Sequence, residues 1–121
     1  MTIILNHTIV PALDKTESAK FFADIFGLKC GRAGHFAPVK VNKGLTFLFD
    51  DDDQFECHHY AFHVSDREFD AIFKRIKGAD VTYGSAPWSL GDGKLNDWGG
   101  GRGLYFRDPN GHVLEIMTVP Q

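Results

Sequence analysis

Apolar and polar residues alternate along two segments of the chain, and a helical pattern follows each segment. Residues 3–10 and residues 57–64 alternate with a period of two, which places successive side chains on opposite faces of a β-strand. Each strand leads into a short polar residue that stands three positions before a glutamate: Asp14 before Glu17, and Ser65 before Glu68. This spacing is typical of the first turn of a helix. The chain therefore predicts a strand followed by a helix, twice.

The two strand–helix segments form an internal repeat. Equivalent residues recur at an offset of 51 or 52: His7 and His59, Phe22 and Phe73, Ile25 and Ile76, and Gly27 and Gly78. The apolar residues before each glycine have helical spacing, and glycine is suited to end a helix. We therefore predict a duplicated module.

After each helix the pattern predicts three more strands. In chain order they are expected at about 28–33, 36–42, 44–50, 80–84, 102–107 and 112–118. The predicted class is α+β, with two tandem β-α-β-β-β modules at about 1–52 and about 55–121. The chain has 121 residues, the length of one domain, so both modules are assigned to a single domain, 1–121.

One segment has no counterpart in the first half. Residues 85–101 are rich in Gly, Ser, Asp and Asn, and contain Trp88 and Trp98. Loops of this length in small domains are usually functional or disordered. We expect this loop, with Arg102 directly after it, to cover a cavity and to stack on or pair with a substrate.

Three residues from separate strands suggest a metal site. His7 and His59 occupy equivalent places in the repeat, so a pseudo-twofold axis would bring their imidazoles together. Glu115 stands between Leu114 and Ile116 in an apolar strand, where a carboxylate is costly unless it is paired or bound to a cation. Two imidazoles and one carboxylate can hold one divalent metal and leave positions open for substrate. Fe, Mn, Ni and Zn all fit this ligand set.

Other interpretations of these residues stay open. A single histidine on a strand is usually an ordinary polar residue, and Glu115 could reach solvent or an arginine. His63 lies two residues beyond His59 on the same face and could line a cavity. We do not expect the remaining histidines to be ligands: His35, His58 and His112.

Composition excludes several classes of protein. The net charge is −3 and the pI about 6.0, so there is no basic excess for binding nucleic acid. No apolar run approaches the roughly 20 residues needed to span a bilayer, and we expect no membrane partner. The N-terminal sequence lacks the pattern of a signal peptide. Cys30 and Cys57 are therefore expected to be free thiols, and the expected location is the cytoplasm.

The end of the chain resembles a known superfamily. Residues 105–115 read Tyr-Phe-Arg-Asp-Pro-Asn-Gly-His-Val-Leu-Glu. Together with the repeated modules and their first-strand histidines, this ending resembles the vicinal oxygen chelate superfamily, which includes glyoxalase I and the fosfomycin resistance, bleomycin resistance and extradiol dioxygenase proteins. The resemblance implies curved mixed sheets around a cavity, where substrate oxygens chelate a divalent metal. It also implies that the ligands are His7, His59 and Glu115.

One position departs from glyoxalase I. The repeat aligns residues 44–48 with residues 111–115, so Leu48 stands where that enzyme has a fourth ligand that also acts as the base. Leucine can neither bind metal nor take up a proton, which argues against glyoxalase I chemistry. A dioxygenase-like, transferase-like or lyase-like reaction fits better, although the anion-binding cluster of fosfomycin enzymes is not evident.

The resemblance leaves a second possibility, a protein that sequesters a drug or metabolite without catalysis. In either case the partner is a small molecule, and we expect a homodimer because small members of the superfamily pair. The residues expected to meet the small molecule are His63, Trp88, Trp98, Arg102, Tyr105 and Leu48.

Overall fold

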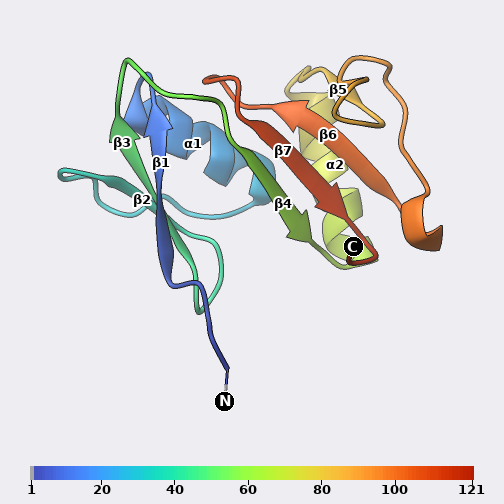
Figure 1. The fold of residues 1–121 in the computed structure, drawn as a ribbon, viewed down its shortest axis with the longest axis horizontal. Coiled ribbons are helices and arrows are strands. Elements are labelled where there is room, and N and C mark those ends of the chain that lie inside the picture. Colours follow the sequence, from blue (N-terminus) through green and yellow to red (C-terminus); the bar gives the residue numbers. More distant parts are fainter. Residues whose placement is uncertain (1) are drawn as a thin grey trace. The chain divides into compact units, whose positions relative to one another are not determined.

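Each predicted strand–helix repeat builds one unit of the structure, a computed structural model that describes residues 2–121 (Figure 1). Unit 1 extends to Glu56, and unit 2 comprises Cys57–Gln121. In each unit a helix covers one face of a small mixed sheet. The prediction of an α+β fold with mixed sheets is therefore confirmed. No helix in the described residues is long and apolar enough to cross a membrane.

Unit 1 has three strands in the order β1-β3-β2. Its elements are β1 (His7–Ala12), α1 (Lys15–Phe26), β2 (Ala37–Lys40) and β3 (Thr46–Asp51). Strand β1 is parallel to β3, and β2 is antiparallel to it. Phe22 of α1 stacks on Phe47 of β3 with ring centroids 5.0 Å apart, and both side chains are buried. The apolar face of α1 thus closes the core of this unit.

Unit 2 has four strands in the order β4-β7-β6-β5. Its elements are β4 (His59–His63), α2 (Asp66–Gly78), β5 (Tyr83–Gly84), the 3-10 turn η1 (Trp98–Gly100), β6 (Gly103–Arg107) and β7 (Val113–Met117). Strand β4 is parallel to β7, whereas β5–β6 and β6–β7 are antiparallel. The core of the unit consists of buried residues from α2, β6 and β7: Phe69, Ile72, Ile76, Leu104, Phe106, Leu114 and Ile116.

The helices begin at the predicted caps. The Asp14 carboxylate accepts hydrogen bonds from the backbone N–H groups of Thr16 and Glu17, and Ser65 and Glu68 form a complete reciprocal capping box. Helix α1 ends at Gly27, whose φ of 71° is left-handed and favours glycine.

Two predicted strand segments are not formed. Residues 28–33 make a single bridge, Cys30 to Val39, because the neighbouring Pro38 has no N–H to donate to a ladder. Residues 3–6 precede the sheet, since the partner strand β3 begins at Thr46, opposite His7. Unit 1 is therefore β-α-β-β rather than the β-α-β-β-β that was predicted.

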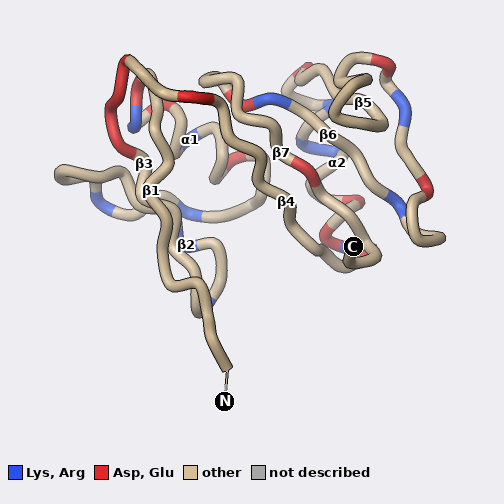
Figure 2. Tube along the Cα trace, in the orientation of Figure 1, with Lys and Arg blue, Asp and Glu red and all other residues tan. Residues whose placement is uncertain are grey.

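Four consecutive aspartates end β3 and continue beyond it (Figure 2). Asp51 accepts a hydrogen bond from the backbone N–H of Lys15 at 2.9 Å, and its carboxylate lies 3.9 Å from Lys15 Nζ. Asp50 lies 3.7 Å from the imidazole of His35. The acidic run therefore supports the N-terminus of α1, where negative charge is favourable.

Hydrogen bonds within the loop 85–101 hold it in place. Asp92 accepts hydrogen bonds from the backbone N–H and the hydroxyl of Ser85, and these bonds, the hydroxyl first, lower the pKa of its carboxyl. The Asn96 side-chain amide donates to the Ser85 carbonyl at 2.8 Å. Gly84, at the base of the loop, has no room for a side chain, since a Cβ would lie 1.7 Å from the Ser89 carbonyl oxygen.

The capping box of α2 gives a direct test of the fold. Ser65→Ala should lower the free energy of unfolding by about 1 kcal/mol, the usual effect of losing a helix cap, as measured by urea denaturation. Hydrogen bonds with Ser65 hold the pKa of Glu68 below its usual range. The stabilisation that the ionised Glu68 carboxylate contributes to the folded parent protein should therefore be present at neutral pH. It should disappear as the pH falls through that lowered pKa.

The matched control is Lys74→Ala on the exposed face of the same helix, which should change stability by less than about 0.5 kcal/mol. Equal losses in the two variants would contradict a specific role for the cap.

Candidate metal centre

The sheet of unit 2 brings His59 and Glu115 together. Strands β4 and β7 are parallel, with Ala61 opposite Glu115 and His59 opposite Val113, so the two side chains lie on the same face. His59 Nε2 donates a hydrogen bond to Glu115 Oε1 at 3.0 Å. The Glu115 side chain is only 5% exposed, whereas that of His59 is 47% exposed. The structure therefore places a buried carboxylate beside an imidazole that solvent can reach.

Tyr105 is a second partner of the buried carboxylate. It lies directly opposite Glu115 in the antiparallel pair β6–β7, and its hydroxyl donates a hydrogen bond to that carboxylate. Burial, followed by this hydrogen bond and the negative charge of Glu115, raises the pKa of Tyr105 well above its ordinary value. Tyr105 therefore remains a protonated donor that orients the carboxylate.

A row of aromatic rings leads away from the pair. The Tyr105 ring lies 5.8 Å from that of His59 and 5.9 Å from that of Trp98. Trp98 in turn lies 6.1 Å from Trp88, which is 79% exposed. The predicted substrate residues Trp88, Trp98 and Tyr105 thus form one continuous row from the buried carboxylate to the surface.

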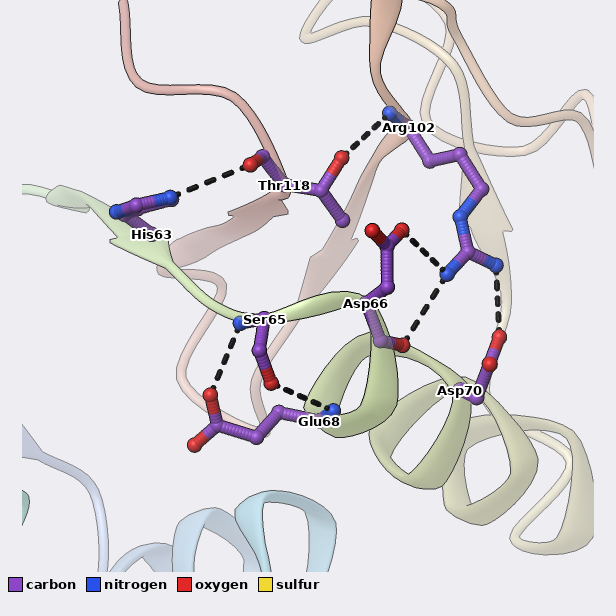
Figure 3. A network of polar contacts seen from close by, with 7 residues as sticks. All are labelled: His63, Ser65, Asp66, Glu68, Asp70, Arg102 and Thr118. Atoms are coloured by element: carbon purple, nitrogen blue, oxygen red, sulfur yellow. Dashed lines mark hydrogen bonds and ion pairs between the residues drawn. The ribbon is translucent and has the colours of Figure 1, made fainter.

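Two other predicted substrate residues have partners elsewhere in unit 2 (Figure 3). His63 Nε2 donates to the Thr118 carbonyl oxygen at 3.2 Å. The Arg102 guanidinium donates to Asp70 at 2.7 Å and to Asp66 at 3.0 Å. These carboxylates, Asp70 first, raise the pKa of Arg102. Arg102 therefore ties the start of β6 to α2, and its role in substrate binding stays a prediction.

Unit 1 carries the other two predicted site residues. Residue His7 lies opposite Thr46 and Leu48 lies opposite Ile9, which reproduces the pairing of His59 with Val113 and of Glu115 with Ala61. The strand register therefore makes Leu48 the equivalent of Glu115, as the repeat predicts. His7 Nδ1 donates to Asn6 Oδ1 at 2.8 Å, which leaves Nε2 of a neutral imidazole with its lone pair.

The donor set fits a divalent metal in its chemistry. Imidazole nitrogen and carboxylate oxygen both bind Fe, Mn, Ni and Zn. The hydrogen bonds from His7 to Asn6 and from Tyr105 to Glu115 are of the kind that orient metal ligands. Within residues 2–121, neither unit by itself gathers three His, Cys, Asp or Glu side chains into a metal-binding cluster. Unit 2 supplies a pair of donors, and the participation of His7 stays a prediction.

The role of Tyr105 as a carboxylate partner was not predicted. The signal was present in the sequence, because Tyr105 and Glu115 lie five residues on either side of Asn110, in the turn that joins β6 and β7. Antiparallel strands around a tight turn place such residues opposite each other.

Comparison with known proteins agrees with this architecture. The model of the Glyoxalase/Bleomycin resistance protein/Dioxygenase superfamily matches residues 4–116. The chain belongs to this superfamily. It is the vicinal oxygen chelate superfamily that the sequence resembles.

The similar proteins have names that denote different activities. A structure of "Oxidase ChaP-H2" is 48% identical, with a TM-score of 0.93 over 99% of this chain and 96% of that chain. Metallothiol transferase FosB of Lysinibacillus sphaericus (strain C3-41) is 26% identical over 94% of this chain and 81% of that protein. A lactoylglutathione lyase from Agrobacterium tumefaciens, 20% identical with a TM-score of 0.72 over 97% of this chain and 91% of that chain, shares the fold.

Tyr105 gives a test of the geometry that requires no metal. Its folded pKa lies above the unfolded value of about 10, so its contribution to stability is present below that pH and is lost as the pH rises above it. In an alkaline titration followed by phenolate absorbance, the last tyrosine should ionise only as the protein unfolds. Tyr105→Phe should remove this late step, and Tyr83→Phe should retain it. A late step that persists in Tyr105→Phe would contradict the hydrogen bond to Glu115.

Proposed function

We propose that this chain is a metal-dependent oxidase that acts on a small molecule, with His7, His59 and Glu115 holding one divalent metal. The observation that carries the proposal is the pair of His59 and the buried Glu115, with Nε2 and Oε1 3.0 Å apart. A buried carboxylate with an accessible imidazole beside it is a preformed half of a metal site. The sequence identity of 48% with "Oxidase ChaP-H2" over nearly the whole chain supports oxidation as the reaction.

The donor set favours iron among the divalent metals. Two histidines and one carboxylate with open positions are typical of non-haem Fe(II) oxygenases, whereas zinc has no redox chemistry. When bound, the metal would supply a Lewis acid and a redox centre for the substrate and dioxygen. The protein's own contribution is to hold the donors: Tyr105 keeps the carboxylate oriented, and the sheet fixes His59 beside it.

The aromatic row indicates the kind of substrate. Trp98 and Trp88 offer large flat surfaces between the donor pair and solvent, and such rings bind other planar aromatic groups by stacking. Members of this superfamily bind substrates that chelate the metal through neighbouring oxygens. We therefore infer a planar aromatic substrate that carries two adjacent oxygen atoms.

Thiol transfer is the second candidate, favoured by the match to FosB. An anionic substrate of such an enzyme needs cationic side chains near the metal. The arginine next to the loop, Arg102, is already bound by Asp66 and Asp70, whereas His59 lies beside the Glu115 carboxylate and the Tyr105 ring. Oxidation therefore fits the described residues better than thiol transfer. Sequestration without catalysis would require only the aromatic row.

A homodimer remains part of the proposal. Strands β1 and β4 are edge strands of their sheets, and edges of this kind are usually covered by another strand, helix or subunit. Near β1, the apolar residues Ile3, Ile4 and Leu5 are between 64% and 99% exposed. A second copy of the chain would cover apolar surface of this kind.

Metal binding tests the proposed centre. We expect the parent to bind about one Fe(II) or Mn(II) per chain in anaerobic titration. His59→Ala and Glu115→Ala should each weaken binding by about a hundredfold or more, since even loss of a residue that supports a ligand has an effect of 10- to 100-fold. His7→Ala should do the same, because His7 supplies the third ligand of the proposed site. His35→Ala, which removes an exposed histidine of unit 1, should bind like the parent.

The Fe(II)-loaded parent should consume dioxygen in the presence of catechol, a planar aromatic probe with two adjacent oxygens, and Glu115→Ala should not. Thiol loss with fosfomycin in place of oxygen uptake would favour the transferase. A parent that binds no metal would leave only the sequestering protein.

Leu48 separates this chain from glyoxalase I. That reaction moves a proton between adjacent carbons and needs a base beside the metal, so the parent should not turn over methylglyoxal hemithioacetal. Leu48→Glu places a carboxylate at the position equivalent to Glu115 and should bind metal about tenfold more tightly, a gain of about 1.4 kcal/mol. Leu48→Gln is the matched control without the charge. Unchanged affinity in a folded Leu48→Glu protein would contradict a metal site shared by the two modules.

A further inference from the structure

His112 is a fully buried titratable residue that the proposed chemistry does not use. It is 0% exposed and lies directly before β7, on the face of the strand that carries Leu114 and Ile116, opposite to Glu115. Its backbone is fixed by Asp108: the His112 N–H donates to Asp108 Oδ1 at 2.9 Å, and the Asp108 N–H donates to the His112 carbonyl at 3.0 Å. The backbone of His112 is therefore held in one place by the turn that precedes it.

The His112 ring acts as a hydrogen-bond acceptor. His112 Nδ1 lies 2.9 Å from the backbone nitrogen of His58. A backbone N–H can only donate, so Nδ1 must carry the lone pair, and the neutral ring must have its proton on Nε2. A buried imidazole in this tautomer is a fixed acceptor, and it cannot bind a metal through Nδ1.

Both backbone groups of His58 are consequently bound to the start of β7. Its N–H donates to the His112 ring, and its carbonyl accepts from the Val113 N–H at 2.9 Å. The next residue, His59, begins β4 and carries the imidazole that contacts Glu115. The segment 52–58 before this point contains no strand, so these two bonds fix the direction in which the chain enters β4.

We propose that His112 is a positioning residue of the metal centre: its buried Nδ1 holds the backbone of His58 and thereby sets the separation of His59 and Glu115. This inference rests on the proposed function, because it assigns a role toward the metal. His112 then acts through the main chain of His58, directly before β4, and does not contact the metal or the substrate.

Two substitutions separate positioning from packing. His112→Asn places a carbonyl oxygen where Nδ1 lies and can accept from the His58 N–H, whereas His112→Leu keeps apolar bulk and loses the acceptor. We expect His112→Leu to weaken Fe(II) or Mn(II) binding by about 10- to 100-fold, the effect of removing a group that orients a ligand. His112→Asn should bind metal nearly as the parent does.

A stability control shows that the effect is specific. Ile76 of α2 is fully buried in the core of unit 2. Ile76→Ala opens a cavity there and should lower the melting temperature with little change in metal affinity. Nitrogen NMR of the parent should show His112 Nδ1 unprotonated, and hydrogen exchange should show the His58 amide protected; neither readout depends on metal or on whether His112→Leu folds.

The outcomes are distinct. A parent that binds no metal overturns the proposed function and, with it, this inference. A parent that binds metal overturns this inference alone if His112→Leu binds equally well, if His112→Asn is as weak as His112→Leu, or if Nδ1 is protonated.

Discussion

Burial of the Glu115 carboxylate is the constraint on which the rest of unit 2 depends. Removing an unpaired carboxylate from water has a penalty of several kcal/mol, so the fold must supply partners from both neighbouring strands. Strand β4 supplies His59 and β6 supplies Tyr105. The four-stranded order places β7 between these two strands, and this is the position from which one side chain can meet both. A pair of hydrogen bonds offsets the burial and orients the carboxylate.

Unit 1 shows what the same register does without that constraint. Leu48 takes the place of Glu115, so β3 has no carboxylate at the position equivalent to Glu115. His7 bonds instead to its own neighbour, Asn6. At the equivalent positions the repeat therefore offers one carboxylate and two imidazoles, the donor set of the proposed metal centre. The asymmetry at these positions lies in one side chain, whereas the register of β1 with β3 repeats that of β4 with β7.

The helix caps and the strand register could be predicted from the sequence because local patterns specify them. The caps at Asp14 and Ser65, the end of α1 at Gly27 and the equivalence of Leu48 with Glu115 all follow from spacing and repeat, and the structure shows them. The strand expected at 28–33 does not form. Alternation of apolar and polar residues does not show whether a partner strand is present, and Pro38 has no backbone N–H to donate. Likewise, the sequence cannot reveal that Asp66 and Asp70 already bind Arg102, since these residues meet only after α2 packs near β6.

The turn sequence from Asp108 to His112 links these observations. Asp108 holds the turn through its hydrogen bonds to the N–H groups of Asn110 and His112, and the turn places Tyr105 opposite Glu115. The residue that closes the turn, His112, reaches across to the backbone before His59. One short segment therefore controls the approach of both partners to the buried carboxylate, one through strand register and the other through a main-chain hydrogen bond. The turn can thus be required along its whole length although, in the proposed centre, only Glu115 at the end of this segment binds the metal. The turn sets the positions of Glu115 and of the two side chains that contact it.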